Sequence, residues 1–301
     1  MDEIKTKQQE LALLINRFIN TDGTQLTAIP SMCLIRASSV SERLYTVQEP
    51  SLYVIAQGSK IVICAQETYQ YDPTSYMIAS IHLPICCQIL HASREEPFLG
   101  IQLTFTADQI LDIMKESGQS RQDKLRPDRG ILVSETSPPL LDAVIRLVRL
   151  LETPADIPIL SPLIMREIFY RVLQGEQSDR VRQFAMIGSQ AQSISKVIEL
   201  IQQNFNKPLR VKALAKEVNM SPSTLYSCFK KITAMSPIQY QKQIRLHEAR
   251  RLLISEPINA AEVAYCVGYE SPSQFSREYL RLFGLPPKLD SKRLHNALNQ
   301  R

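Results

Sequence analysis

Two segments in the last third of the chain place polar side chains at helical spacing that suits hydrogen bonding to nucleic-acid bases. In residues 221–232 and 271–283, apolar residues spaced three and four apart mark one helix face, and polar residues occupy the other. The outward side chains predicted to read bases are Ser223, Tyr226, Ser227, Ser273, Gln274, Ser276 and Arg277. Arg277 could pair in a bidentate way with guanine, and Gln274 could do the same with adenine. The first segment offers a more ambiguous readout, so we expect it to depend more on phosphate contacts and DNA shape.

Basic side chains near these segments suit contact with a phosphate backbone. The residues predicted to make such contacts are Thr224, Lys230, Lys231, Lys242, Arg245 and Arg281. For any single lysine, a plainly solvated charge is an equally good interpretation. Residues 190–301 carry 17 Lys and Arg against 8 Asp and Glu, whereas residues 1–189 carry 18 against 22. The C-terminal part is therefore the part expected to bind a polyanion, and double-stranded DNA is the expected partner.

A repeat of about fifty residues positions the two polar faces. Ser-Pro-Ser at 221–223 recurs at 271–273, and the turn at Ser236-Pro237 returns as Pro286-Pro287. Ser suits a helix N-cap and Pro the first helical position, so each copy predicts a short helix, a turn and a capped second helix, which is the outline of a helix-turn-helix. A long helix from Ser236 to about Ile254, roughly 25 Å long at 1.5 Å per residue, would join the copies. It could hold both reading helices about one DNA turn apart.

The N-terminal part has a different pattern. Short β-type runs separated by turn residues occur between positions 26 and 105 and predict an antiparallel barrel or sandwich with a cavity of small-molecule size. The runs lie at 32–37, 52–57, 60–65, 67–71, 76–80, 85–92 and 98–105. Helices are expected at 4–18 and across 106–175, where Pro162 would open the last helix. The apolar side of that helix could be core or a dimer face, and core is favoured. The polar stretch around 181–192 predicts a linker between a sensor and dimerisation domain at 1–180 and a DNA-binding domain at 193–301.

The predicted roll also carries side chains that could contact a small molecule. These candidate effector-pocket residues are Tyr53, Tyr76, His82, Cys86, Cys87 and His91. Neither a His-x-His spacing nor a CxxC pair occurs, so we expect no metal and no cofactor. Cys86 and Cys87 should point to opposite faces of one strand, and one hypothesis is that the thiol facing the cavity senses a soft electrophile. The N-terminus has neither a signal-peptide nor a membrane-span pattern, so we expect a cytoplasmic protein without membrane contact.

The C-terminal repeat closely resembles the AraC/XylS family of bacterial transcription factors, in the stretches ALAKEVNMSPSTLYSCFKKITAMSPIQYQKQIRLHEARRLL (213–253) and VAYCVGYESPSQFSREYLRLFGLPP (263–287). Residues 49–60, 67–85 and 158–176 are similar to the subgroup with the AraC-type regulator N-terminus, which includes YqhC-like proteins. The resemblance implies an α+β fold: a cupin-like antiparallel β-roll with flanking helices, then an all-α domain with two helix-turn-helix units. It also implies three partners, namely a small-molecule effector, promoter DNA and RNA polymerase, and a possible homodimer. Members of the family usually activate transcription, so activation is the expected mode of regulation.

Two positions depart from the family pattern. Subgroup members often have arginine where this chain has Ser227, and the closing P-x-x-Y-R pattern appears as Pro287-Lys288-Leu289-Asp290-Ser291. The expected function is a sequence-specific DNA-binding regulator that is not an enzyme. Three alternatives remain at this point: a cupin-type metal-dependent enzyme with an appended DNA-binding domain, a DNA-repair methyl acceptor and a ligand-independent architectural protein. The missing metal triad argues against the first, and the missing four-cysteine zinc spacing argues against the second.

Overall fold

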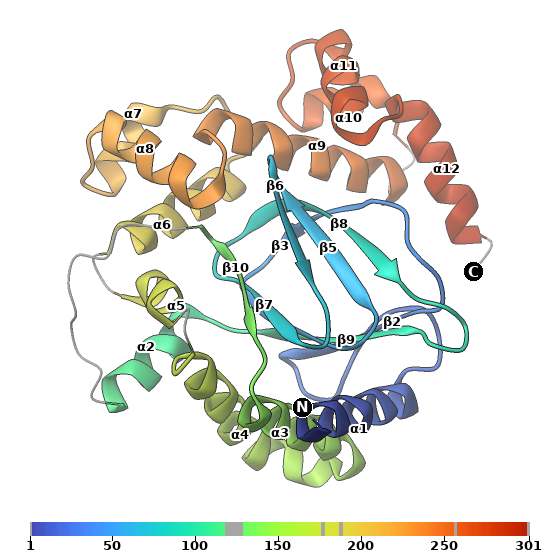
Figure 1. Ribbon diagram of the computed structural model, residues 1–301. Coiled ribbons are helices and arrows are strands. Elements are labelled where there is room, and N and C mark those ends of the chain that lie inside the picture. Colours follow the sequence, from blue (N-terminus) through green and yellow to red (C-terminus); the bar gives the residue numbers. More distant parts are fainter. Residues whose placement is uncertain (1, 118–128, 176–177, 187–188, 256–257, 300–301) are drawn as a thin grey trace.

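The computed structural model describes residues 2–117, 129–175, 178–186, 189–255 and 258–299. In these residues, antiparallel strands form two sheets that face each other as a roll, with one layer of helices below it and another above it (Figure 1). The lower helices come from the N-terminal part of the chain and the upper helices from the C-terminal part. This arrangement confirms the predicted α+β fold, with a β-roll followed by an all-helical region.

Both sheets are antiparallel throughout. The larger has the order β1-β2-β9-β4-β7-β10, with the bounds Gly23–Leu26 (β1), Met32–Ala37 (β2), Phe98–Thr104 (β9), Ser51–Gln57 (β4), Ser75–Ala79 (β7) and Ile131–Glu135 (β10). The smaller has the order β3-β8-β5-β6, with the bounds Leu44–Gln48 (β3), Leu83–His91 (β8), Ser59–Cys64 (β5) and Glu67–Tyr71 (β6). Sequence patterning missed β1, β3 and β10. The expectation that 106–175 is helical was therefore wrong at β10, which pairs with β7.

The central strand β4 explains how the roll is covered on both sides. Its residues alternate between two cores, because successive side chains in a strand point to opposite faces. Leu52 and Val54 pack with the lower helices, whereas Tyr53 and Ile55 pack inside the roll. The interior between the sheets is filled by side chains, among them Tyr71, which is 2% exposed.

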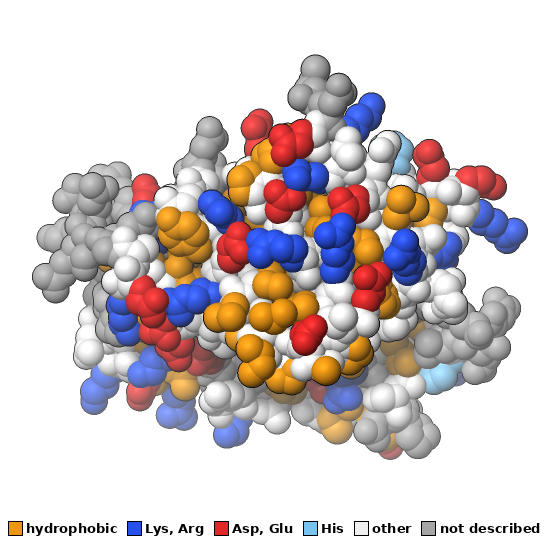
Figure 2. Space-filling model, turned by 90° about the horizontal axis from the view of Figure 1, so that it is seen from below, with side chains coloured by type: hydrophobic (Ala, Val, Ile, Leu, Met, Phe, Trp, Pro, Cys, Tyr) orange, Lys and Arg blue, Asp and Glu red, His pale blue; other side chains and the backbone are white. Residues whose placement is uncertain are grey.

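Helices α1 (Asp2–Phe18), α3 (Pro138–Arg149) and α4 (Ile157–Val172) form the lower layer against the larger sheet. The expected opening of the last helix at Pro162 was wrong, because α4 begins at Ile157 and takes Pro158 in its first turn. Pro162 lies inside α4, where it removes one backbone hydrogen bond. Figure 2 shows this underside, on which hydrophobic side chains lie among alternating basic and acidic ones.

The chain between the roll and the C-terminal helices is largely helical. Helix α5 (Ser178–Ala185) packs against α2 (Ala107–Glu116), and α6 begins at Gln190. Residues 181–192, predicted to be a linker, therefore include the second half of α5 and the start of α6. Ser189 caps α6 by accepting a hydrogen bond from the Gln192 amide at 3.0 Å. No helix in the described parts of the chain is long and apolar enough to cross a membrane.

The C-terminal helices repeat as predicted, with the bounds α6 (Gln190–Gln203), α7 (Val211–Glu217), α8 (Pro222–Thr233), α9 (Pro237–Ser255), α10 (Ala260–Cys266), α11 (Pro272–Phe283) and α12 (Pro287–Asn299). The repeat extends to the backbone. Asn219 and Gly268, forty-nine residues apart, both have positive φ in the turn of their unit, and Ala234 and Gly284 both end their second helix in a left-handed conformation. A side chain at Gly268 would collide with the Asn206 carbonyl, so only glycine fits there.

The roll contacts the first helix-turn-helix unit through several hydrogen bonds. Arg129 donates to the backbone carbonyls of Lys230, at 3.0 Å, and Lys231, where the carbonyls of α8 lack helical partners. The Gly130 amide donates to the Ile232 carbonyl at 2.9 Å. The Tyr240 hydroxyl of α9 donates to the His82 carbonyl at 3.0 Å. The first unit is thereby fixed to the roll at the end of α8 that lies away from Ser221.

A separate contact joins the roll to the second unit. The Tyr45 ring of β3 lies edge-on to Phe283 of α11, with centroids 5.0 Å apart. The Arg250 guanidinium of α9 lies 5.5 Å from the centre of the same tyrosine ring. At the rim of this contact, Arg293 of α12 forms an ion pair with Glu42 at 2.6 Å.

Candidate functional site

Helix α8 presents the polar face expected of a reading helix. Ser221 caps it by accepting from the Thr224 amide at 3.1 Å. The apolar residues predicted to be buried, Leu225, Phe229 and Ile232, are 0–1% exposed. The opposite face is exposed, as expected from the helical period. It carries Ser223, Thr224, Tyr226, Ser227, Lys230 and Lys231.

Helix α11 is capped in the same way, by Ser271 accepting from the Gln274 amide at 3.3 Å. Phe275 and Tyr279 are fully buried, and Phe283 takes the third core position in place of Leu282, which is half-buried. The residues predicted to read bases or contact phosphate lie on the outer side: Ser273, Gln274, Arg277 and Arg281 are exposed, and Ser276 is half-buried.

Glu278 was missed in the sequence and organises part of this surface. Its carboxylate accepts hydrogen bonds from Lys242 at 2.8 Å, Tyr269 at 2.8 Å and Gln274 at 3.1 Å. Burial alone would raise the pKa of Glu278, but these three donors outweigh it and lower the pKa. Two of the predicted DNA contacts, Lys242 and Gln274, therefore have an acidic partner within the protein.

Arg245, which was predicted to contact the DNA phosphate backbone, makes its hydrogen bonds within the protein instead. Its guanidinium donates to the carbonyls of Phe205 at 2.7 Å, Gly268 at 2.8 Å and Lys207 at 3.0 Å. Because these carbonyls follow α6 and α10, Arg245 ties both units to α9. Its donors point into the protein, so the geometry does not support a phosphate contact.

Asp290 stands at the position where the chain departs from the family's closing pattern. Its carboxylate is fully buried and accepts from Arg250 at 2.8 and 3.2 Å and from the Tyr279 hydroxyl at 2.9 Å. An ion pair buried to this degree is stable only when its remaining polar atoms are also hydrogen-bonded. Helices α9, α11 and α12 are thus held together by one charged group.

The six candidate pocket residues do not converge on one cavity. Tyr53 is buried between the sheets and donates to Gln48 at 2.7 Å, and Tyr76 packs with the lower helices. His91 lies at the end of β8, with its Nδ1 2.5 Å from the Ser59 hydroxyl. Of the six, His82 alone lines the large cleft described below.

Cys86 and Cys87 point to opposite faces of β8, as expected. Cys87 lies in the core of the roll, whereas Cys86 pairs across the ladder with Tyr45 on the side of the C-terminal helices. Burial raises the pKa of the Cys86 thiol, which opposes formation of a reactive thiolate. Among the described residues, no group of three His, Cys, Asp or Glu could hold a metal ion.

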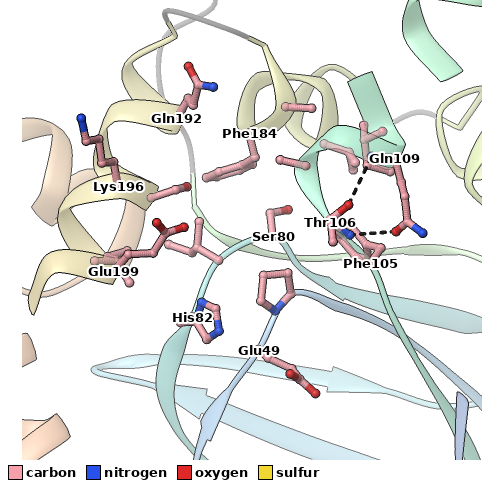
Figure 3. A pocket seen from close by; sticks show the side chains of 18 of the residues that line it. Glu49, Ser80, His82, Phe105, Thr106, Gln109, Phe184, Gln192, Lys196 and Glu199 are labelled. Atoms are coloured by element: carbon pink, nitrogen blue, oxygen red, sulfur yellow. Dashed lines mark hydrogen bonds between the residues drawn. The ribbon is translucent and has the colours of Figure 1, made fainter. Parts of the chain in front are cut away.

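A cleft of about 1020 Å³ lies where the roll meets α2, α5, α6 and the end of α7. Figure 3 shows Ser80 and His82 on the strand side, facing Phe184, Lys196 and Glu199 on the helix side. Sequence reasoning missed this site because its walls come from segments that only the fold brings together. Of its residues, only His82 was a candidate beforehand.

Comparison with known proteins gives two family matches. The model of the AraC-type transcriptional regulator N-terminus matches residues 28–180, and a helix-turn-helix domain model matches residues 214–293. The regulator GbdR of Pseudomonas aeruginosa is 32% identical over 43% of this chain, which spans about a third (35%) of that relative. The lactose operon transcription activator of Staphylococcus xylosus is 23% identical over 85% of this chain and 88% of its own length.

Solved structures agree on the fold. ToxT of Vibrio cholerae has a TM-score of 0.57 at 12% identity, covering 86% of this chain and 97% of that one. A structure of unsaturated fatty acid-bound ToxT has a TM-score of 0.54 at 12% identity, covering 89% and 95%. At this identity the likeness shows the fold alone, whereas the N-terminal family model spans half of the chain. The chain therefore belongs to the AraC-type family of transcriptional regulators.

Proposed function

We propose that this protein is a sequence-specific DNA-binding transcriptional regulator, controlled by a small-molecule effector held by its N-terminal region. One observation carries the proposal: two capped helices, fifty residues apart, expose polar reading faces and are joined by α9. The nineteen residues of α9 span about 28 Å at 1.5 Å per residue, somewhat less than the roughly 34 Å of one turn of DNA.

Several finer features of the proposal follow from the family. The regulator activates transcription through RNA polymerase at its promoter, in the cytoplasm. The lactose operon relative is named an activator. Subgroup membership among YqhC-like proteins remains a prediction. The domain boundaries at 1–180 and 193–301 are likewise part of the proposal, with α5 and the start of α6 as the connection.

The DNA-binding part is tested by titrating the full-length protein against duplexes from upstream of its own gene and its neighbours. Fluorescence anisotropy should find a duplex bound at least a hundredfold more tightly than a scrambled one, because specific binding typically exceeds non-specific binding by about 10³ or more. Binding should weaken steeply with added salt. Equal affinity for every duplex tested would reject sequence-specific regulation.

We also propose that a second copy of the chain covers the outer face of α4. Ile159, Leu163 and Tyr170 lie four, then seven residues apart on one helix face and are 70%, 60% and 39% exposed. Of the four apolar residues of this helix for which core was favoured, Ile164, Ile168 and Val172 are buried, but Leu163 is exposed, so the core expectation was wrong for Leu163. Exposed apolar residues on one helix face mark interaction surfaces when they are contiguous.

Analytical ultracentrifugation tests the dimer. Wild-type protein should sediment at twice the chain mass of 34.2 kDa, and Leu163→Glu should sediment as a monomer. Leu13→Glu, at an exposed apolar position on α1, is the matched control and should remain dimeric. A monomeric wild type would reject the dimer, and dimers that survive Leu163→Glu would place the interface elsewhere.

A further inference from the structure

The cleft between the roll and α5–α6 has the dimensions of a small-molecule site. Its volume, about 1020 Å³, lies at the upper end of the range of about 300–1000 Å³ common for ligand pockets. It is lined by residues of the roll and α2 on one side and of α5, α6 and the end of α7 on the other. An occupant would therefore touch the sensor and the first helix-turn-helix unit together.

Ser80 gives a specific reason to expect a ligand. Ser80 is 7% exposed, and its hydroxyl group has no hydrogen-bond partner in the structure. Its backbone amide is already satisfied by the Gly130 carbonyl at 2.8 Å, so only the side chain is left over. Buried hydroxyl groups nearly always have a partner, because leaving one unpaired is costly. Figure 3 shows the Ser80 side chain in the middle of the lining residues.

The charged residues of the lining are mostly acidic. Glu49, Glu199 and Glu217 line the cleft, against one lysine, Lys196. Burial lowers the pKa of His82, although Glu49 and Glu199 oppose this, so the imidazole is neutral near pH 7. All four of these charged residues are solvent-exposed, and carboxylates outnumber cations among them by two.

The remaining surface of the cleft is partly apolar. Phe105 contributes from the connection before α2 and Ile110 from α2 itself, and Val181 and Phe184 contribute from α5. Aromatic and aliphatic walls with a few polar groups are typical of sites that bind the body of a small organic molecule. The Gln109 side chain is engaged in capping α2, where its Oε1 accepts from the Thr106 amide at 2.9 Å.

We infer that this cleft binds an organic cation: an amine or ammonium compound with an apolar body, whose charge lies among the glutamates and whose polar edge hydrogen-bonds Ser80. The inference rests on the proposed function, since it names the effector class of that regulator. A carboxylate ligand, such as the fatty acid bound by ToxT, would meet like charges here. A cation would gain both electrostatic attraction and the buried hydroxyl.

The experiment uses the full-length protein and probes matched in shape. Phenethylamine, choline and spermidine are titrated by calorimetry beside 3-phenylpropionate, the carboxylate analogue of phenethylamine. At least one cation should bind, and 3-phenylpropionate should bind at least tenfold more weakly than phenethylamine. Glu199→Gln and Ser80→Ala should each lower the affinity for the bound cation by about tenfold. This is the loss expected when one charge-assisted hydrogen bond is removed. Glu95→Gln, an exposed carboxylate outside the cleft, is the control and should leave affinity unchanged.

Promoter binding measured on the same samples separates this inference from the proposed function. If selective DNA binding is present but none of the cations binds, or if 3-phenylpropionate binds best, the cation assignment is overturned and the regulator remains. If a cation binds equally to wild type and both cleft variants, its site lies elsewhere and the assignment also fails. If the wild-type protein shows no selective DNA binding, the proposed function itself is refuted.

Discussion

Arg277 and Lys230 are both exposed on reading helices, but they occupy different places along them. Arg277 lies within the first two turns of α11, where a groove-reading helix meets base edges. Lys230 lies in the last turn of α8, beside carbonyls that Arg129 binds. The first position suits base recognition and the second suits a phosphate contact.

Arg277→Ala should relax sequence preference, whereas Lys230→Ala should weaken binding to all sequences about equally. Loss of a bidentate contact to guanine costs about 1–3 kcal/mol of discrimination at one base pair. Loss of a phosphate contact reduces the slope of the logarithm of the binding constant against the logarithm of the salt concentration by about one. Competition binding against a set of single-base operator variants, at two salt concentrations, measures both. Equal losses across all duplexes for both variants would contradict the role of Arg277.

At the scale of the elements, short-range signals were the reliable ones. Ser221 and Ser271, each followed by proline, predicted the starts of α8 and α11, because capping depends on residues within one turn. Strand β3 was missed because its burial comes from the C-terminal helices rather than from its own alternation. Glu278 and Ser80 could not be recognised, since their environments are built by residues distant in sequence.

Asp290→Ala should lower the free energy of unfolding by about 3–5 kcal/mol, because it leaves the buried Arg250 guanidinium without a counter-charge. Arg17→Ala is the matched comparison. It removes an exposed ion pair with Glu152 that lies far from Asp290 and should cost no more than about 1 kcal/mol. Urea unfolding followed by circular dichroism gives both values. Similar small losses in the two variants would show that Asp290 does not hold α9, α11 and α12 together.

The His247 ring lies 6.5 Å from the Tyr45 ring and 5.8 Å from the Phe283 ring, so it should make the contact between β3 and the second unit sensitive to acid. Burial, assisted by the charge of Arg250, lowers the pKa of His247 to about 4 from an ordinary 6.5. Between these values the unfolded chain binds more protons than the folded one, so stability should fall as pH decreases from 6.5 towards 4. Each unit of pKa difference corresponds to about 1.4 kcal/mol.

The measurement compares thermal unfolding of wild type and His247→Phe at pH 7 and pH 5. The phenylalanine variant should lose less stability on acidification, because it has no imidazole to protonate. Two curves that shift equally would indicate that other groups dominate the acid response in this range.

At the scale of the whole molecule, the roll holds both helix-turn-helix units through separate contacts. Arg129 and His82 contact the first unit, and Tyr45 contacts the second. Neither set of contacts covers the outward faces of α8 and α11. The sensor is therefore placed to set the relative orientation of the reading helices, and an effector could shift that orientation by binding at the cleft.

Hydroxyl-radical footprinting of the full-length protein on its operator tests most directly whether one chain reads DNA with two helices. Each bound subunit should protect two neighbouring major-groove segments on one face of the duplex, about 10 base pairs apart. Arg277→Ala should remove base preference in one segment and leave the other intact. Protection of a single groove segment per subunit would contradict reading by α8 and α11 together.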